Sequence, residues 1–529
     1  MLPQLYCSSI LIVGVSSLAL YLVWRCIYQL FFSPIRNVPG PWYAAVSDLW
    51  LTTHIARLQQ CMTVHSLFDT YGPIVRIGPN NIAFKDLAGI RPVYSILKLD
   101  KGPAYRKLKT AHDADQAMTI LEHGPHSARR KAWASQYTIN SLSKFQPDMR
   151  DAAQDLISTI TAIEHERAVD CLVLFRHFTI EVIMSILYGC RLDTLKSWST
   201  GVEDTICEAI GDFPLQVTLR GAAPLWLWRL ICKIPHRRWQ KICMADTTLV
   251  EACQRYIHPF FARGHVNGLR PLMNTEKDSE GKVPLILRLL QYRDPASGLP
   301  NLHEKDIIAE AIGHTIAGTD TTAITLSYIC WELGKRPDVA AKLRAEIDGA
   351  MPDPMVVPNI GILQSLPYLN ACVKEGLRIY GAGPSLLERV VRVTPPASTP
   401  VTLGGHVIPD GTIVATQSWS LSRDPAVFPS PNEFMPERWL DGDSSAMHAY
   451  LNPFGFGTRI CGGQNLAQIM LRIGLASIVR NFTIEVPPET TEKSMAICDA
   501  FVIFPQAMSC KVCTVLLVRR QHSLKPPSS

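Results

Sequence analysis

The stretch "NPFGFGTRICGGQ", Asn452–Gln464, determines how the rest of the sequence is interpreted. A single thiol, Cys461, lies among glycines and two residues after Arg459. Glycines on both sides remove side chains, let the backbone approach a large flat partner and turn N–H groups toward the sulfur. Those donors favour a thiolate, and the apolar helix expected from Asn465 onward adds its N-terminal dipole. The loop therefore indicates an anionic sulfur ligand that faces a large cofactor.

An inert cysteine that fills the core is the alternative, and it is the more common role of a lone buried thiol. The surrounding residues argue against it, because "FGFGTRICGG" is similar to the heme-binding loop of the cytochrome P-450 superfamily, the heme-thiolate monooxygenases. The family pattern Phe-x-x-Gly-x-Arg-x-Cys-x-Gly is matched in full by Phe454, Gly457, Arg459, Cys461 and Gly463. The resemblance implies heme b as the cofactor and Cys461 as the axial iron ligand. It also implies that Arg459 reaches a heme propionate and that Phe454 packs under the sulfur.

A second match is an expected ion network. "KEGLR" supplies Glu375 and Arg378, which lie on one face of an expected helix and can pair. Seen alone, they would be a surface ion pair. "PERW" follows with Arg438, and the P-450 family joins three such residues in a buried network on the proximal side of the heme. Because buried charges need complete pairing, the resemblance implies a structural role for all three.

"AGTDTT", Ala317–Thr322, lies midway along a long apolar helix. An acid and a hydroxyl at such a position cost free energy unless they have a task, and we expect a local distortion of the helix there. The resemblance identifies this stretch as the oxygen-activation motif of the family. By that resemblance, Thr321 hydrogen-bonds dioxygen or a water, and Asp320 supplies protons.

Further basic residues match less specific patterns. "HSARRK" places His126 and Arg130 on one helical face. The alternative is a solvated face, which is the usual location of a basic run. The family often sets two such groups against a heme propionate, and Arg389 in "LLERVV" corresponds to another propionate contact.

The resemblance also outlines a mostly apolar substrate pocket. Its candidate residues are His314, Ala317, Leu386, Leu387 and Phe501. His314 lies two turns before Thr321 on nearly the same helical face, so its ring could hydrogen-bond a substrate oxygen. The alternative is a histidine satisfied by a neighbouring helix, the more common outcome for a lone helical histidine.

The N-terminus predicts a membrane anchor over residues 1–32. "SSILIVGVSSLALYLVW", Ser8–Trp24, carries no charge and approaches the length of a bilayer span, about 17–25 residues. Basic residues follow this stretch, whereas a signal peptide has them before it, and this order predicts a cytosolic catalytic domain. A buried core helix is the alternative. The prolines of residues 33–45 favour a stiff hinge between the anchor and a catalytic domain over residues 46–529.

The remaining sequence predicts a mainly α fold with small β-sheets (α+β) in a single large domain. Two short strands should surround a turn at Gly78–Asn81. A helix from Leu302 to Lys335 is apolar on most sides and should cross the centre of the fold. Helix breaks are expected at Gly211–Pro214 and at Gly221–Pro224.

Charge and cysteine content exclude other classes. The net charge is +6, from 52 basic and 46 acidic residues, and no basic run resembles a nucleic-acid footprint. Fifteen irregularly spaced cysteines indicate a reduced, cytosol-facing protein. Cys510 and Cys513 fall on an expected strand, where an i,i+3 pair points to opposite faces, which favours ordinary strand cysteines over a chelate.

The predicted reaction inserts one atom of dioxygen into a C–H bond of a hydrophobic small molecule. Electrons should come from NADPH through a separate membrane-bound reductase, because no flavin or dinucleotide motif is evident. The pattern is most similar to fungal microsomal members, which implies the endoplasmic reticulum membrane and a terpenoid or polyketide of secondary metabolism. The alternatives are a xenobiotic or fatty-acid hydroxylase, a reductase-independent heme-thiolate isomerase, a non-catalytic heme carrier and a heme-free membrane scaffold.

Overall fold

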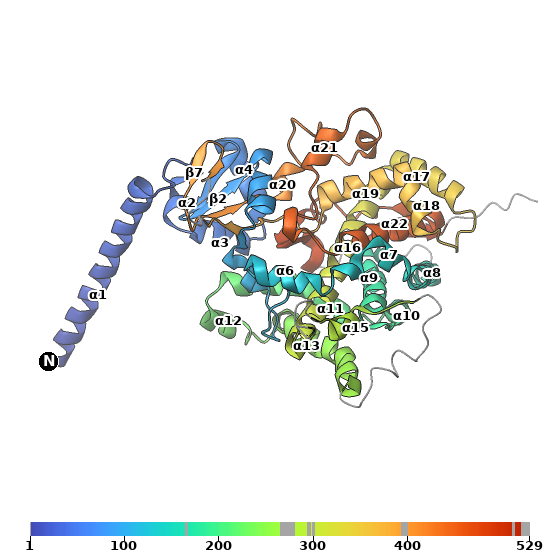
Figure 1. The fold of residues 1–529 in the computed structure, drawn as a ribbon, viewed down its shortest axis with the longest axis horizontal. Helices are drawn as coiled ribbons and strands as arrows, with labels where there is room; N and C mark the ends of the chain where they lie inside the picture. The colour runs from blue at the N-terminus through green and yellow to red at the C-terminus, as the bar shows by residue number, and fades with distance from the viewer. Residues whose placement is uncertain are drawn as a thin grey trace, which may run out of the picture.

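The computed structural model describes residues 2–163, 168–264, 281–293, 298, 302–392, 400–509 and 514–519. It shows a mostly helical body with small sheets, from which helix α1 (Leu2–Ile27) projects (Figure 1). The predicted mainly α fold with small β-sheets is confirmed. Cys510 and Cys513 lie outside the described residues, and strand β12 begins directly after them at Thr514.

Helix α1 continues into a π-helical turn, η1 (Tyr28–Phe32). Leu11–Phe32 is long and apolar enough to cross a membrane, and none of it is buried. The same length and composition occur in α9 (Cys171–Tyr188), but that helix is completely buried and belongs to the core. The N-terminal helix is therefore compatible with an anchor, and its insertion stays a prediction.

The segment 33–45 is tied to the body at strand β1. Arg76 is buried and donates to the carbonyl of Gln29 at 2.9 Å and to its amide oxygen at 2.6 Å. The Arg76 N–H also donates to the carbonyl of Pro39 at 2.7 Å. Residues 34–37 form turns and Trp42–Val46 forms helix α2, so the segment is not an extended connector.

The largest sheet has the strand order β1-β2-β8-β5-β3. These strands are β1 (Ile74–Gly78), β2 (Asn81–Phe84), β8 (Ile413–Ala415), β5 (Arg389–Val390) and β3 (Asp100–Lys101). Only the β2–β8 pair is parallel among these described strands. The predicted hairpin at Gly78–Asn81 is confirmed. The sheet thus brings Lys101 and Arg389 onto adjacent strands, where they are paired in register.

Three smaller sheets use strands from distant parts of the chain. They pair β10 with β11, β12 with both β4 and β9, and β6 with β7. Their bounds are β4 (Ala168–Asp170), β6 (Val401–Leu403), β7 (His406–Ile408), β9 (Phe482–Glu485), β10 (Ile497–Ala500), β11 (Val502–Pro505) and β12 (Thr514–Arg519).

Helix α16 (Glu304–Lys335) crosses the centre of the helical part, as predicted. A capping box of His303 and Asp306 starts it, and Pro337 follows its last turn. It packs against α9, α19 (Pro367–Tyr380) and α22 (Gln464–Asn481). Buried apolar side chains from these helices form one continuous core.

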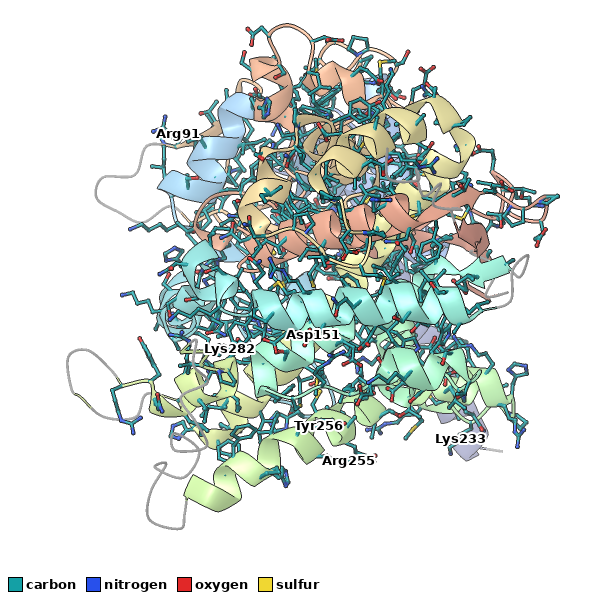
Figure 2. The ribbon with its side chains drawn as sticks, turned by 90° about the vertical axis from the view of Figure 1, so that its right-hand side faces the viewer. Arg91, Asp151, Lys233, Arg255, Tyr256 and Lys282 are labelled. Carbon is teal, nitrogen blue, oxygen red and sulfur yellow. The ribbon has the colours of Figure 1, made fainter. Side chains whose placement is uncertain are left out.

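The other helices surround this centre. Figure 2 shows α8, marked by Asp151, and α13, marked by Arg255 and Tyr256, crossing one face of the helical part. The remaining helical segments are α2, α3 (Leu49–Ala56), α4 (Gln60–Tyr71), α5 (Leu87–Arg91), η2 (Pro92–Ile96), η3 (Pro103–Leu108), α6 (His123–Lys131), η4 (Ala134–Tyr137), α7 (Ile139–Ser143), α8 (Gln146–Ala162), α10 (Thr194–Ser199), α11 (Thr205–Ala222), α12 (Leu225–Ile231), α13 (Arg237–Gly264), α15 (Leu285–Gln291), α17 (Pro337–Ala350), α18 (Ile360–Ser365), α20 (Ser418–Leu421), η5 (Pro436–Trp439), α21 (Ser445–Tyr450), η6 (Gly457–Arg459) and η7 (Gln506–Ser509).

One predicted helix break is wrong. Helix α11 runs through Gly211–Pro214 and ends only at Ala222, where the second predicted break is confirmed. A proline inside a helix costs roughly 3 kcal/mol. The long packing interface between α11 and α13 offsets this cost.

Candidate active site

Cys461 lies in a short loop whose path requires glycine. The N–H of Cys461 donates to the carbonyl of Phe454 at 2.8 Å. Gly455 and Gly457 have φ angles of +76° and +61°, a conformation that residues with a side chain rarely adopt. A Cβ on Gly457 would also lie 2.1 Å from the carbonyl oxygen of Tyr94. The glycines thus fix how closely this loop approaches its neighbours.

Helix α22 begins directly after Gly463, and the Gly463 N–H donates to the Cys461 sulfur. Gly462 lies against Trp133, whose ring would be 2.3 Å from an added Cβ. Desolvation by the surrounding protein atoms raises the pKa of the Cys461 thiol even though the residue has exposed surface, and the Gly463 N–H and the Arg130 charge oppose this only in part. The loop's own donor therefore acts in the expected direction and favours the thiolate, although desolvation outweighs it. Metal coordination is what deprotonates such a thiol. The Cys461 side chain itself remains accessible.

Basic side chains of three elements gather beside this loop. Arg459 donates to the carbonyls of Ile120 at 3.0 Å and Leu121 at 2.6 Å, while its buried Nε has no hydrogen-bond partner in the described part of the chain. His126 on α6 is buried, and its Nδ1 likewise has no partner among the described residues. Lys101 on β3 belongs to the same group.

Two more arginines from the sequence analysis lie in this region. Arg130 donates to the carbonyl of Ile460 at 2.5 Å, directly beside Cys461 in the chain. Arg389 is buried, donates to the carbonyl of Glu388 at 2.8 Å and stacks over the Tyr94 ring at 4.8 Å.

These basic side chains lower one another's pKa. Burial and the charge of Arg459 lower the pKa of His126 to about 2, and the same two causes hold the pKa of Lys101 well below its usual value. Burial and the nearby Arg389 lower the pKa of Arg459 to about 10. Opposite charge favours the protonated form of a base, so this cluster is suited to receive an anionic group.

Glu375 is the centre of a fully buried ion network. Its carboxylate accepts from Arg378 at 2.8 and 2.9 Å, from Arg438 at 3.0 Å and from the Trp439 indole at 2.9 Å. The two arginines use further N–H groups on the backbone carbonyls of Ser422, Pro429, Ser430, Pro431 and Glu433. Such complete pairing offsets the cost of burying three charges and fixes the chain around α19 and η5.

Asp320 and Thr321 occupy the middle of α16. The Nε of Arg176 on α9 donates to Asp320 Oδ1 at 2.7 Å, and both side chains are buried. The Thr321 hydroxyl donates to the carbonyl of Ala317 at 2.8 Å. The helix is continuous from Glu304 to Lys335, so the predicted distortion is wrong. Pairing within the helix and with Arg176 satisfies both polar groups without it.

One face of α16 remains accessible in mid-helix. Ala317 is exposed and Thr321 is partly exposed, whereas Thr319, Asp320 and Thr322 are buried. Residues four apart lie on one helical face, so Ala317 and Thr321 form a continuous stripe.

His314 has protein partners for both ring nitrogens. Its Nδ1 lies 2.8 Å from the Tyr137 hydroxyl, and its Nε2 lies 3.4 Å from a Glu310 carboxylate oxygen. The Trp133 ring meets the imidazole edge to face at 4.9 Å. This geometry agrees with the alternative of a satisfied histidine rather than with a substrate contact.

The other predicted pocket residues differ in accessibility. Leu386 is buried in a small apolar cluster with Val64 and Phe68. Leu387 is partly buried, and its side chain reaches to within 3.5 Å of a Cβ placed on Gly455 in the cysteine loop. Phe501 is partly buried, has a φ of +70° and meets the Tyr105 ring edge to face at 6.3 Å.

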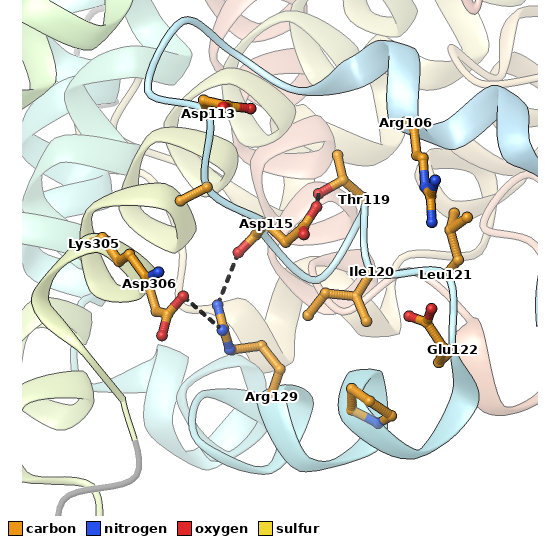
Figure 3. Close-up of a pocket in the computed structure, with 12 residues that line it drawn as sticks. Arg106, Asp113, Asp115, Thr119, Ile120, Leu121, Glu122, Arg129, Lys305 and Asp306 are labelled. Carbon is orange, nitrogen blue, oxygen red and sulfur yellow. Dashed lines mark hydrogen bonds and ion pairs between the residues drawn. The ribbon is translucent and has the colours of Figure 1, made fainter.

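Figure 3 shows a charged pocket of 380 Å³ that sequence reasoning did not find. The segment 113–122, α6 and the start of α16 line it. Arg129 reaches from α6 to Asp306 at 3.1 Å and to the carbonyl of Asp115 at 3.0 Å. The pocket and the Arg459 contacts thus share one wall, the segment 113–122.

Comparison with known proteins agrees with this geometry. The family described as Cytochrome P450 matches residues 38–512. Cytochrome P450 monooxygenase aflV of Aspergillus parasiticus is 29% identical over 91% of this chain and 92% of its own. Cytochrome P450 monooxygenase sdnE of Sordaria araneosa is 30% identical over 88% and 90%, and N-acetyltryptophan 6-hydroxylase ivoC of Emericella nidulans is 29% identical over 89% and 90%. The chain belongs to the cytochrome P450 family, and it is an oxygen-incorporating oxidoreductase.

The residues present fit the heme iron cofactor of that family. Cys461 offers an accessible sulfur at a helix N-terminus. Arg459 Nε and His126 Nδ1 are unpaired within the described residues, and they lie in a cationic cluster that suits carboxylates. Lys101, Trp133 and Arg176 were missed by sequence reasoning. No local pattern marks them, because each gains its partners only through the fold.

Proposed function

We propose that the protein is a membrane-anchored, heme b-dependent monooxygenase of fungal secondary metabolism that oxidises a C–H bond of a hydrophobic small molecule. The observation that carries the proposal is the accessible Cys461 at the start of α22, beside the basic cluster that contains Arg459 and His126. When bound, the heme supplies dioxygen activation, which a thiolate ligand promotes by donating electron density.

The chain's own residues would hold this cofactor. Cys461 would bind the iron, with Phe454 beside the sulfur and Gly457 and Gly463 shaping the loop. Four bases would bind the propionates, namely His126, Arg130, Arg389 and Arg459. Glu375, Arg378 and Arg438 would maintain the backbone beneath them through their ion network.

Asp320 and Thr321 would deliver protons to the reacting oxygen atoms. Arg176 holds Asp320 Oδ1, which leaves Oδ2 as the atom that would accept and release a proton. The Thr321 hydroxyl can exchange its intrahelical bond for a water or dioxygen on the accessible face of α16, next to Ala317. General acid chemistry of this kind needs such a donor within hydrogen-bond reach of the reacting atoms.

Electrons would come from NADPH through a membrane-bound NADPH–cytochrome reductase. The exposed apolar helix α1 supports attachment to membrane lipid, and the basic residues after it support a catalytic domain on the cytosolic side. The endoplasmic reticulum membrane is the site that we propose for this arrangement.

The substrate would be a hydrophobic terpenoid or polyketide intermediate. The relatives named above act, by their names, as monooxygenases and as a hydroxylase of N-acetyltryptophan. Apolar candidate pocket residues, Ala317, Leu386, Leu387 and Phe501, support a hydrophobic substrate as well. Oxidation of a xenobiotic or a fatty acid is the alternative, and product analysis with each class distinguishes them.

A reductase-independent heme-thiolate isomerase is the second alternative. Such an enzyme can dispense with a proton-supplying acid and threonine, so Asp320 and Thr321 favour the monooxygenase. Purified protein with reductase should consume NADPH in the presence of substrate. Product formed without reductase or dioxygen would favour the isomerase.

The carbon monoxide spectrum tests the central assignment. Reduced protein with carbon monoxide should give a Soret band shifted strongly to the red, and Cys461→Ala should abolish that shift. Cys498→Ala is the matched control, because Cys498 is a free, partly exposed cysteine outside the loop. A red-shifted band that survives in Cys461→Ala would contradict the proposed ligand.

A further inference from the structure

Helices α12 and α13 contact each other through one face of each helix. The Trp228 ring of α12 meets the Trp239 ring of α13 edge to face, with the ring centroids 6.2 Å apart. The Trp239 indole also donates to the carbonyl of Ile231, the last residue of α12, at 2.9 Å. Residues four apart lie on one helical face, and Cys232 lies four residues after Trp228. Cys243 lies four residues after Trp239, so the face that carries the two rings also carries both thiols.

The two thiols are in direct contact. The Cys243 side chain forms a hydrogen bond with the Cys232 side chain, and both cysteines are free and partly exposed. Desolvation and this hydrogen bond raise the pKa of the Cys243 thiol. Cys243 therefore keeps its proton and donates it to the Cys232 sulfur, which favours negative charge on that sulfur. A nucleophilic sulfur beside a protonated thiol is the arrangement from which a disulfide forms.

The surroundings of Cys232 are basic. Arg229, Lys233 and Arg237 flank it in the chain, and Lys233 and Arg237 are exposed. Positive charge and partial exposure distinguish a reactive cysteine from an inert one. Cys253 is the opposite case on the same helix α13, because it is buried in the core.

Cys243 is fixed in the fold, whereas Cys232 has room to move. Gln216 donates to the carbonyl of Cys243 at 2.9 Å and to Asp246 Oδ1 at 2.7 Å, which secures this turn of α13 to α11. Cys232 ends α12, and residues 233–237 after it are exposed. A disulfide brings two sulfurs to about 2.0 Å, closer than a hydrogen bond does. Movement at the end of α12 supplies this approach without a change in α13.

We propose that Cys232 and Cys243 are a peroxide-sensitive dithiol whose disulfide fixes the end of α12 on α13. The oxidant is hydrogen peroxide, which oxygen-activating enzymes release when electron use and product formation are uncoupled. The Cys232 sulfur attacks the O–O bond, becomes a sulfenic acid and releases water. The Cys243 sulfur then displaces hydroxide from Cys232, and the proton of the Cys243 thiol turns that hydroxide into a second water. Two electrons thus pass from the thiols to peroxide, and a thiol reductant reverses the bond.

Mass spectrometry of the full-length protein tests the proposal with added hydrogen peroxide, so the result does not depend on catalytic activity. Free thiols are blocked with iodoacetamide, and trypsin then separates residues 230–233 from residues 242–255. Dilute peroxide should yield these two peptides as a linked pair, lighter by two hydrogen atoms than their sum. Dithiothreitol should separate them again.

Serine variants identify the two sulfurs. Cys243→Ser should abolish the linked pair and leave Cys232 as a sulfenic acid, which dimedone labels. Cys253→Ser is the matched control, because Cys253 is on the same helix and in the same tryptic peptide, and it should form the linked pair as the wild type does. Phenylarsine oxide tests the contact without oxidation, since one trivalent arsenic binds two adjacent thiols. It should bridge Cys232 and Cys243 in the wild type and in Cys253→Ser.

The possible results separate this proposal from the proposed function. Oxidation of wild-type Cys232 that stops at the sulfenic acid would contradict the dithiol. A bond from Cys232 to Cys253 would contradict it too, as would reduced Cys232 and Cys243 at a peroxide dose that oxidises the partly exposed Cys498. A protein that forms the linked pair but lacks the red-shifted carbon monoxide band keeps the dithiol and loses the heme-thiolate assignment.

Discussion

Arg176 on α9 and Asp320 on α16 form a buried ion pair, with the Arg176 Nε 2.7 Å from Asp320 Oδ1 and only 5% and 6% of the two side chains exposed. The pair joins the two helices that share the largest interface of the fold. It also gives Asp320, the acid that we propose for proton delivery, a permanent cationic partner.

Breaking this pair from one side should destabilise the protein strongly. Asp320→Asn removes the carboxylate that pairs directly with the buried Arg176 charge, and such losses cost about 3–5 kcal/mol. Chemical denaturation should show that decrease in the free energy of unfolding. Asp338→Asn, which removes the exposed partner of Arg336, is the control and should cost about 1 kcal/mol or less.

Replacing both partners distinguishes pairing from packing. The double variant with Arg176→Met and Asp320→Leu removes both charges and should recover most of the loss. If it is no more stable than Asp320→Asn, the cost comes from lost packing and the ion-pair explanation is wrong.

Asp170 should make the free energy of unfolding depend on pH near neutrality. Burial raises the pKa of this carboxyl to about 7, against the opposing Arg176 charge and the N–H groups of Val173 and Leu172. The pKa of this carboxyl is about 4 in the unfolded chain and about 7 in the folded protein, so between these pH values only the folded state keeps the proton. The stabilising contribution of this carboxyl is therefore complete below about pH 4. As pH rises from there to about 7, the free energy of unfolding falls by about 1.4 kcal/mol per pH unit.

Asp170→Asn provides the test. Asparagine caps a helix about as well as aspartate, so α9 keeps its N-cap while the titration disappears. Unfolding free energies from pH 5 to 8 should fall more steeply in the wild type than in the variant. Parallel curves would show that Asp170 does not titrate in this range.

The sequence predicted those parts of the site that depend on local spacing. The glycine loop around Cys461, the i,i+3 pair of Glu375 and Arg378, and the long helix α16 all follow from short patterns with a physical cause. The structure supplies what spacing cannot give, namely that Arg438 comes to within 3.0 Å of Glu375 from 63 positions away.

The errors arose where tertiary contacts overrule local tendencies. Pro214 suggested a helix break, but the packing of α11 on α13 keeps the helix intact. His314 shares a helical face with Thr321, and its contacts with Tyr137 and Glu310 favour the alternative of a satisfied histidine, so its contact with substrate stays a prediction. Lys101 could not be found at all, because its neighbours in space come from segments far apart in the chain.

Thr321 should couple electron use to product formation. Thr321→Ala removes the accessible hydroxyl of α16, so NADPH consumption should continue while product falls several-fold and peroxide is released. The carbon monoxide spectrum should be unchanged. The ratio of product to NADPH consumed is the measurement.

Ser327→Ala is the matched control for Thr321. The Ser327 hydroxyl makes the same bond to the carbonyl four residues earlier on the same helix, at 2.7 Å, but it is fully buried. Coupling should therefore be normal in this variant. Equal coupling in wild type and Thr321→Ala would remove Thr321 from the mechanism.

Helix α12 should form a second membrane contact beside the anchor. Its exposed apolar side chains are Leu225, Trp226 and Leu230, between 55% and 65% accessible, and Ile234 follows at 49%. Tryptophan favours the headgroup region, and Arg229 and Lys233 on the same segment suit anionic lipid. In Figure 1, α12 lies on the same side of the body as α1. Without residues 2–32, the protein should still sediment with vesicles of phosphatidylcholine and phosphatidylserine at low salt.

The residues of α12 decide whether this binding is specific. In the truncated protein, Trp226→Ser with Leu230→Ser removes apolar area that would enter the interface, so the bound fraction should fall severalfold at every salt concentration. Ile362→Ser is the control, because Ile362 is an exposed apolar residue on α18, at a distance from α12 in the view of Figure 1. It should leave binding unchanged. Failure of the truncated protein to bind vesicles even at low salt would contradict the second contact. An equal loss of binding in Ile362→Ser and in the double variant would contradict it as well. In either case α1 alone provides the attachment.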